Sequence, residues 1–251
     1  MTRFTLATEG LCFNFGGLQV TDNVSFRLES GARHALIGPN GAGKSTFINL
    51  LTGMLTPMRG TIFLEDSDIT HLPAERRVHR GLARTFQINT LFPQLSPLDA
   101  TTLTICQRRG LGAKLFRRVA DCTEAIAEAE ALLGQLGLAD ECRYPTCELS
   151  YGRQRLLEIA LALASRPRVL LLDEPAAGVP MRESAELFQA IAALPRDMAI
   201  LFIEHDMELV FRFAERITVM VGGKILCEGP PGEIAASPEV RTVYLGEDDD
   251  G

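Results

Sequence analysis

The sequence predicts an α/β fold: a core with a mixed sheet, an N-terminal antiparallel β subdomain and an inserted helical subdomain. Unbroken apolar runs are typical of buried parallel strands, and the chain has three of them, at 32–38, 168–175 and 197–205. Two loosely alternating runs, 4–13 and 18–28, flank the turn sequence "NFGG" and predict an antiparallel pair. From about residue 90 to 165 the apolar spacing is helical, which places a helical block inside the α/β pattern.

The remaining elements follow from local signals. A helix is expected from about Lys44 to Met54, then a strand at "GTIFLED", a proline-led helix at 73–80 and a short strand at 81–87. The helical pattern at 181–194 joins two apolar runs as a βαβ unit, and 216–229 is expected to form a hairpin around Gly222 and Gly223. We therefore expect one domain over residues 1–251, with an α/β core at about 1–89 and 166–251 and a helical lobe at about 90–165.

Composition narrows the class of protein. The 251 residues are 46% hydrophobic and 23% charged, which is enough apolar material for a large core. The net charge of −7 argues against a nucleic-acid partner, because binding the phosphate backbone requires a basic face. The six cysteines form no CxxC pair and are expected to be reduced. No window has the roughly 20 apolar residues that cross a bilayer, so work at a membrane would require a partner.

A glycine-rich stretch supplies the strongest motif. "GPNGAGKST" fits the phosphate-loop pattern G-x-x-x-x-G-K-[ST], with an apolar strand before it and a helix-forming run after it. Its backbone N–H groups can surround phosphates, Lys44 supplies positive charge, and the Ser45 hydroxyl can bind Mg²⁺. The sequence thus predicts a P-loop NTPase core whose nucleotide-binding residues are Gly38, Pro39, Asn40, Gly41, Ala42, Gly43, Lys44, Ser45 and Thr46.

Two acids end the apolar run "VLLLDEP". Asp173 suits a Mg²⁺ ligand that acts through water, and Glu174 can orient and polarise an attacking water molecule. A pair of solvated acids at a strand end is common by itself. Together with the phosphate loop, the pair indicates a nucleoside triphosphate hydrolase.

The stretch "LSYGRQRLLEIALALA" opens a helix with the composition of an anion site. Ser150 and Gly152 precede an apolar run, so a hydroxyl and unpaired backbone N–H groups meet at one helix end.

These motifs together resemble the ATP-binding cassette ATPases over essentially the whole chain, because "LSYGRQ" is similar to their LSGGQ signature. The resemblance implies that Ser150 and Gly152 contact the γ-phosphate of ATP bound on an opposite subunit in a head-to-tail dimer.

The resemblance assigns three further residues. Gln87 in "RTFQ" is similar to the glutamine that touches Mg²⁺ and senses the transport partner, and His205 in "IEHD" is similar to the switch histidine that binds the γ-phosphate. Phe15 in "NFGG" is similar to the aromatic residue that stacks on adenine, although core packing is an alternative for one Phe near a turn.

The chain also departs from the family at two positions. Arg153 stands where the signature usually has Gln, and the phosphate-facing Ser and Gly remain. Pro180 in "AAGVPM" stands where the family usually has Asp or Asn, and proline has neither a donor N–H nor a polar side chain. Two such chains would both lack that contact, so we expect a heterodimer with a second, similar ATPase. A homodimer in which a backbone carbonyl or water fills the gap is the alternative.

A finer resemblance concerns the kind of transporter. "GLARTFQINTLF", "IEHDMELV" and "VYLGE" are similar to ATPase subunits of importers for branched-chain amino acids, urea and short-chain amides. It implies ATP and Mg²⁺ as cofactors, transmembrane permease subunits as partners, an indirect link to a solute-binding protein, and a position at the cytoplasmic face of the inner membrane. The permease is expected to dock on an apolar surface at 87–98. The alternatives are a soluble ATP-binding cassette ATPase without a transport role and a cassette that does not hydrolyse ATP.

Overall fold

The computed structural model describes residues 4–85, 91–111 and 122–245. The first part forms β1 (Phe4–Phe15), β2 (Leu18–Glu29), β3 (Arg33–Ile37), α1 (Lys44–Thr52), β4 (Arg59–Leu64), β5 (Ser67–Asp68), α2 (Ala74–His79) and β6 (Leu82–Arg84). Helices follow, namely α3 (Pro97–Arg108), α4 (Thr123–Gln135), the short 3₁₀ helix η3 (Thr146–Glu148) and α5 (Tyr151–Ala164). The chain then alternates through β7 (Val169–Asp173), α6 (Met181–Ala192), β8 (Ala199–Ile203), α7 (Met207–Phe213), β9 (Arg216–Val221), β10 (Lys224–Gly229), α8 (Pro231–Ala236) and α9 (Pro238–Leu245).

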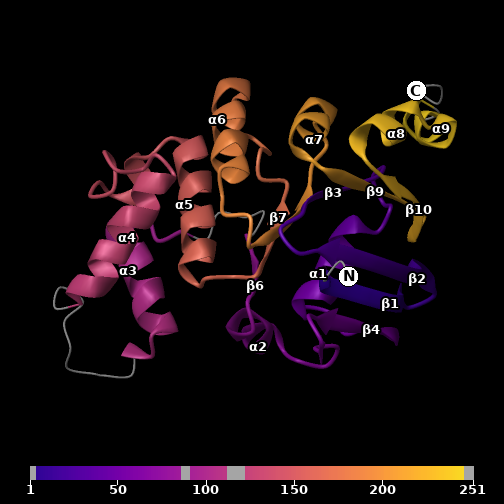
Figure 1. Cartoon of the computed structure of the whole chain (residues 1–251), viewed down its shortest axis with the longest axis horizontal. Coiled ribbons are helices and arrows are strands. Elements are labelled where there is room, and N and C mark those ends of the chain that lie inside the picture. The colour runs from indigo at the N-terminus through magenta and orange to yellow at the C-terminus, as the bar shows by residue number, and fades with distance from the viewer. Residues whose placement is uncertain (1–3, 86–90, 112–121, 246–251) are drawn as a thin grey trace.

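Two sheets organise the molecule, as the sequence predicted (Figure 1). One has the order β2-β1-β4-β5 and is antiparallel throughout. The other has the order β10-β9-β3-β8-β7-β6 and is parallel except for the β9–β10 hairpin, which turns at Gly222 and Gly223 with positive φ. The sheet is therefore mixed, and α3, α4 and α5 form a separate helical group beside it (Figure 1).

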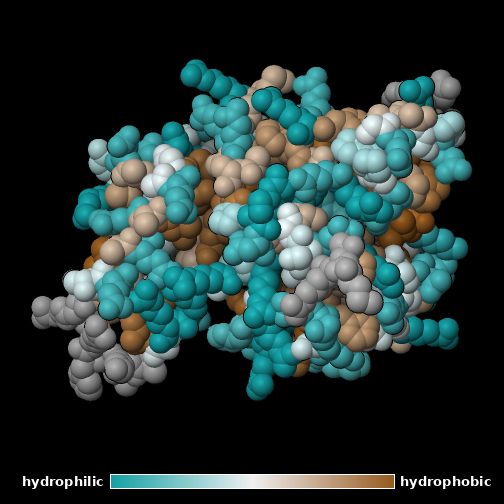
Figure 2. Space-filling view, viewed as in Figure 1, coloured by the Kyte–Doolittle hydropathy of each residue, from teal (hydrophilic) through white to brown (hydrophobic). Residues whose placement is uncertain are grey.

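The core lies on both faces of the larger sheet. Side chains alternate across a strand, so Leu36 on β3 packs with Phe26 and Phe47 between the two sheets and α1, whereas Ala35 and Ile37 face the opposite layer. This sandwich fixes the carboxyl ends of β3 and β7, where the phosphate loop and the two acids begin. On the face seen in Figure 2, hydrophilic side chains cover most of the helical group and most of the part that contains the sheets. Smaller hydrophobic areas lie between these side chains. None of the helices in the described ranges combines the length and apolarity that crossing a membrane requires.

One core position carries a pH-sensitive side chain. His34 on β3 is 1% exposed, and its Nε2 lies 2.8 Å from the Thr218 hydroxyl, which itself donates to Glu228. Burial lowers the pKa of His34 from 6.5 to about 4, against the opposing influence of Glu228. The folded protein therefore holds a neutral His34 at a pH where the unfolded chain binds a proton.

We expect His34 to reduce stability as the pH falls from about 6.5 towards 4. In that window the unfolded state binds more protons, so the free energy of unfolding decreases with falling pH, by about 2 kcal/mol between pH 7 and pH 5 from this residue alone. Urea unfolding at both pH values checks this, with His34→Gln as the comparison, because other groups also titrate. The variant should lose less stability than wild type between pH 7 and pH 5. If both proteins lose the same free energy of unfolding, His34 is not the group responsible.

Candidate functional site

The phosphate loop connects β3 to α1 and depends on glycine for its shape. Gly38, Gly41 and Gly43 all have positive φ. A Cβ at Gly38 would lie 2.0 Å from the Met220 carbonyl oxygen, and one at Gly43 would lie 2.5 Å from the Val20 carbonyl oxygen. The loop can pack this closely against its neighbours only because these positions have no side chain.

The loop opens onto a cavity of about 200 Å³, whose lining residues are Val20, Asn40, Gly41, Ala42, Gly43, Lys44, Ser45, Thr46, Glu174 and His205. The Lys44 ammonium is buried at the first position of α1 and donates to the carbonyl oxygens of Gly38 and Pro39, at 2.5 and 2.9 Å. The structure thus places the loop, its lysine and two side chains from the segments after β7 and β8 around one space.

Asp173 ends β7, directly before Glu174 of the cavity wall, and is 5% exposed. Its Oδ2 accepts a hydrogen bond of 2.6 Å from Arg84 at the end of β6, and the other guanidinium nitrogen of Arg84 donates to Asn49 of α1, also at 2.6 Å. Arg84 therefore connects the carboxylate to the helix that begins at the phosphate loop.

Glu174 and His205 face each other across the carboxyl ends of β7 and β8. Glu174 Oε1 lies 2.7 Å from His205 Nε2, and the backbone N–H of Glu174 donates to the Ile203 carbonyl oxygen. Glu174 has a φ of 49°, an unusual value for a residue with a side chain. The hydrogen bond to Ile203 stabilises this sharp turn, which directs the carboxylate away from the strand and towards the cavity.

Glu204, directly before His205, is a buried acid that the sequence analysis did not single out. Its carboxylate accepts from the backbone N–H groups of Ala176 and His205, at 2.8 and 3.2 Å. Burial raises the pKa of Glu204 above its ordinary value, and Glu174 acts in the same direction, against the two N–H donors. Glu204 thereby links the segment after Glu174 to the segment that carries His205.

The residues around the cavity suit a polyphosphate with a hard divalent cation. Glycines with positive φ, successive backbone N–H groups and a buried ammonium are the features that bind phosphates at the start of a helix. The Ser45 hydroxyl and the Asp173 carboxylate are oxygen donors of the kind that Mg²⁺ prefers, with water and phosphate completing its shell. No cluster of three or more His, Cys, Asp or Glu that could form an all-protein metal site occurs in the described ranges.

The Ser150–Gly152 segment lies away from this cavity, at the start of α5. Ser150 is the N-cap residue, and its hydroxyl accepts from the Arg153 N–H. The same hydroxyl donates to Glu183 Oε2 at 2.9 Å, and the Gly152 N–H donates to that oxygen at 3.0 Å. The predicted helix end, with its hydroxyl and N–H donors, is therefore present, and a carboxylate of the chain itself lies at it.

Two predicted residues are not brought to the cavity by the structure. Phe15 ends β1, is 54% exposed and packs edge-on against Phe13 with ring centroids 4.9 Å apart, but it is not among the residues that line the cavity. Its exposure differs from that of a core residue. Gln87 lies outside the described residues.

Three contacts of the site were missed by the sequence analysis: Arg84 with Asp173, Glu204 with the two backbone N–H groups, and Glu183 with the start of α5. Each joins residues that are far apart in the chain. The acid in "IEHD" at the end of a buried strand was the available signal for Glu204. No local pattern marks the other two.

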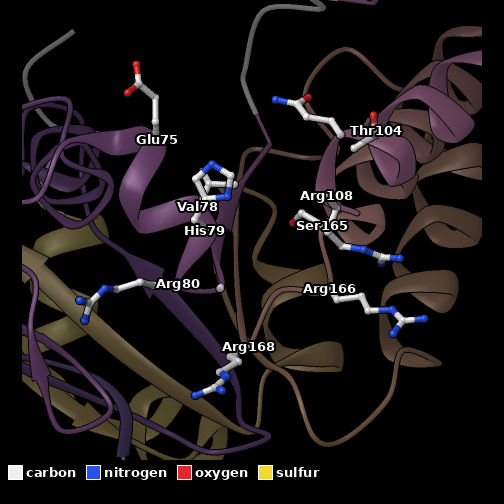
Figure 3. Close-up of a pocket in the computed structure, with 11 residues that line it drawn as sticks. Glu75, Val78, His79, Arg80, Thr104, Arg108, Ser165, Arg166 and Arg168 are labelled. Atoms are coloured by element: carbon white, nitrogen blue, oxygen red, sulfur yellow. The ribbon is translucent and has the colours of Figure 1, made fainter. Parts of the chain in front are cut away.

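A larger cleft of about 540 Å³ lies elsewhere, between α2 and the start of β6 on one side and the ends of α3 and α5 on the other (Figure 3). Arg80 follows α2, Arg108 ends α3, and Arg166 and Arg168 lie between α5 and β7 (Figure 3). Arg108 and Arg166 both pair with Glu128, and Arg168 pairs with Glu65. Because three of these four arginines are already paired with carboxylates, this cleft is a weaker candidate for phosphates than the loop.

Comparison with known families gives two matches. The ABC transporter family matches residues 21–177. The family described as branched-chain amino acid ATP-binding cassette transporter matches residues 224–250.

Full-length relatives and solved structures agree with these matches. The chain is 39% identical over 256 residues to the high-affinity branched-chain amino acid transport ATP-binding protein LivG of Salmonella typhimurium, covering 98% of this chain and 100% of the relative. It is 38% identical to BraF of Pseudomonas aeruginosa, a protein of the same description, with the same coverage. The ADP conformation of MJ1267, an ATP-binding cassette of an ABC transporter, superimposes with a TM-score of 0.86 at 30% identity, covering 98% of this chain and 100% of that one. CbiO1 from Clostridium perfringens, part of the ABC transporter complex CbiONQ, gives a TM-score of 0.81 at 25% identity, with 98% and 97% covered.

Proposed function

Since the chain belongs to the ABC transporter family and is an ATPase of it, we propose that it powers an importer for branched-chain amino acids. The observation that carries this proposal is the single cavity shared by the phosphate loop, Glu174 and His205. The names of LivG and BraF, together with the match at 224–250, support the solute class. Urea and short-chain amides are the related solutes that the sequence also suggested.

We assign the following roles to the site residues, and the geometry of the cavity supports them. The loop residues Gly38–Thr46 bind the phosphates, Lys44 compensates their charge, and Glu174 orients the attacking water with His205 beside it. Ser45 and Asp173 would hold Mg²⁺, with Gln87 as the further ligand implied by the family. When bound, the cation neutralises charge on the phosphates.

A dimer would complete the site. Ser150 and Gly152 lie outside the cavity of their own chain, which agrees with a role towards ATP bound on an opposite subunit. Pro180 is the N-cap residue of α6 and offers no side-chain hydrogen bond. We therefore favour a heterodimer with a second ATPase that keeps a polar residue at this position, over a homodimer.

The partners and the location belong to the same proposal. The whole chain acts as one ATPase domain, with an α/β core at about 1–89 and 166–251 and a helical lobe at about 90–165. It is a peripheral subunit at the cytoplasmic face of the inner membrane, attached to transmembrane permease subunits. Through them it responds to a solute-binding protein.

Reconstitution tests this function. The purified chain should hydrolyse ATP in a Mg²⁺-dependent manner. Proteoliposomes that hold the permease subunits, this chain and the second ATPase, with the solute-binding protein outside, should accumulate labelled leucine when ATP is enclosed. Accumulation of urea in place of leucine would correct the solute. Hydrolysis without any permease that binds the chain would favour the alternative, a soluble ATPase. Full transport with this chain as the sole ATPase would end the heterodimer proposal.

A further prediction concerns the surface on which the permease is proposed to dock. Phe92 precedes α3 and is 70% exposed, so it presents an apolar ring to a partner. Phe92→Glu is expected to reduce transport at least roughly tenfold and spare the hydrolysis of the isolated chain, because a charge in an apolar contact is poorly solvated. Leu226→Glu, at an exposed apolar residue on β10, is the matched control. Equal transport by the two variants would show that the surface is misplaced.

A further inference from the structure

The start of α5 is covered by a side chain from another helix. Glu183 lies in the first turn of α6, and its Oε2 accepts from both the Ser150 hydroxyl and the Gly152 N–H. These two groups are the donors that the proposed function assigns to a γ-phosphate. Helices α5 and α6 are adjacent in the fold (Figure 1).

The fit of this carboxylate depends on the glycine in the signature. A Cβ at Gly152 would lie 2.2 Å from Glu183 Oε2 and 3.0 Å from Glu183 Cβ. The space beside the Gly152 N–H is thus filled by the acid. A phosphate oxygen that accepted from the same N–H and the same hydroxyl would need this position, so the two anions exclude each other.

Pro180 explains why Glu183 is free to reach α5. An acid at the third position of a helix commonly accepts from the backbone N–H of its own N-cap residue. In α6 the N-cap residue is Pro180, which has no N–H, so this local partner does not exist. The donors that its carboxylate contacts are those at the start of α5. The proline that departs from the family pattern and the carboxylate at the signature are therefore two parts of one arrangement.

We propose that Glu183 is an internal competitor for the γ-phosphate at the signature helix, and that ATP-driven dimerisation must displace it. The proposal rests on the proposed role of Ser150 and Gly152 across the dimer. The carboxylate stabilises the α5 end in the monomer, and a phosphate replaces it because it brings more negative charge and more acceptor oxygens to the same donors. After displacement, Glu183 remains in the first turn of α6, where a negative charge is still favourable.

The test is a titration of dimer formation. Light scattering follows the full-length chain at fixed concentration while a non-hydrolysable ATP analogue is added with Mg²⁺. The second ATPase is supplied in equal amount if the chain alone stays monomeric. Glu183→Ala should lower the analogue concentration at half-maximal dimerisation by roughly tenfold, the worth of a net charge-assisted hydrogen bond. Glu183→Gln, which keeps an acceptor oxygen but loses the charge, should lower it less.

Controls separate competition from a purely structural role. Glu186→Ala, at an exposed acid on the same helix, should leave the titration unchanged, and analogue binding to dilute monomer should be equal in all variants. If Glu183→Ala lowers only the melting temperature, or raises the analogue concentration needed, Glu183 is a structural cap and the competitor idea is wrong. Ser150→Arg tests the proposed role of Ser150 across the dimer. If this variant still dimerises normally, Ser150 has no such role. If it fails to dimerise but Glu183→Ala has no effect, only the competition by Glu183 is refuted.

Discussion

Glu174→Gln is expected to lower the rate of ATP hydrolysis by at least roughly 100-fold, while ATP affinity stays near the wild-type value. The side chain stands at a sharp turn after β7, 2.7 Å from His205 and on the wall of the phosphate cavity. Glutamine has the same shape but neither the charge nor the basicity to polarise water. The phosphate loop lies on a different segment and keeps its contacts. Phosphate release and calorimetric ATP binding measure the two effects.

The matched control is Glu208→Gln, at an exposed acid on α7. It should hydrolyse ATP at the wild-type rate. The Glu174 variant should also accumulate as a dimer in ATP, because the nucleotide that holds the subunits together is no longer consumed. Turnover by Glu174→Gln within a few-fold of wild type would move the catalytic role to another acid.

The parts of the site that the sequence predicted are those determined by short segments. The phosphate loop needs glycine at fixed spacing because its own backbone requires positive φ at Gly38 and Gly43, so sequence and conformation correspond directly. Asp173 and Glu174 were predicted for a similar reason, since the apolar run that precedes them is typical of a buried strand. The mixed sheet followed from the contrast between unbroken and alternating runs.

The contacts that could not be predicted depend on the packing of distant elements. Arg84 and Asp173 meet because β6 and β7 are neighbours in the sheet. The order of the strands cannot be predicted from the sequence of either strand. From its local sequence, Glu183 is predicted to be an ordinary acid in the first turn of a helix. Only the packing of α6 beside α5 shows that its carboxylate meets Gly152.

Arg77 is the clearest case of such a residue, and Arg77→Ala is expected to lower the free energy of unfolding by about 3 kcal/mol or more. In the sequence Arg77 is one of two adjacent arginines in "PAERRVHR" and looks like a surface residue of a short helix. In the structure it is 1% exposed, and burial lowers its pKa to about 10, so it remains charged at neutral pH. Its guanidinium donates four hydrogen bonds of 2.7–2.9 Å, to the carbonyl oxygens of Leu50, Leu51, Thr70 and Leu72.

Two of those acceptors belong to the last turn of α1, the helix whose first residues carry the phosphate loop. Removing Arg77 takes these donors from three buried carbonyls and one part-buried carbonyl, and it opens a cavity against Gly53. The loss of stability therefore includes both the lost hydrogen bonds and the cavity. Urea unfolding measures it, and Arg76→Ala, at the exposed neighbour on the same helix, should change stability by less than about 0.5 kcal/mol. Arg77→Lys keeps the charge but cannot reach all four carbonyls, and it should fall between the two. If Arg77→Ala and Arg76→Ala unfold at the same urea concentration, the end of α1 is held by its own backbone and by Gly53, and Arg77 merely fills space.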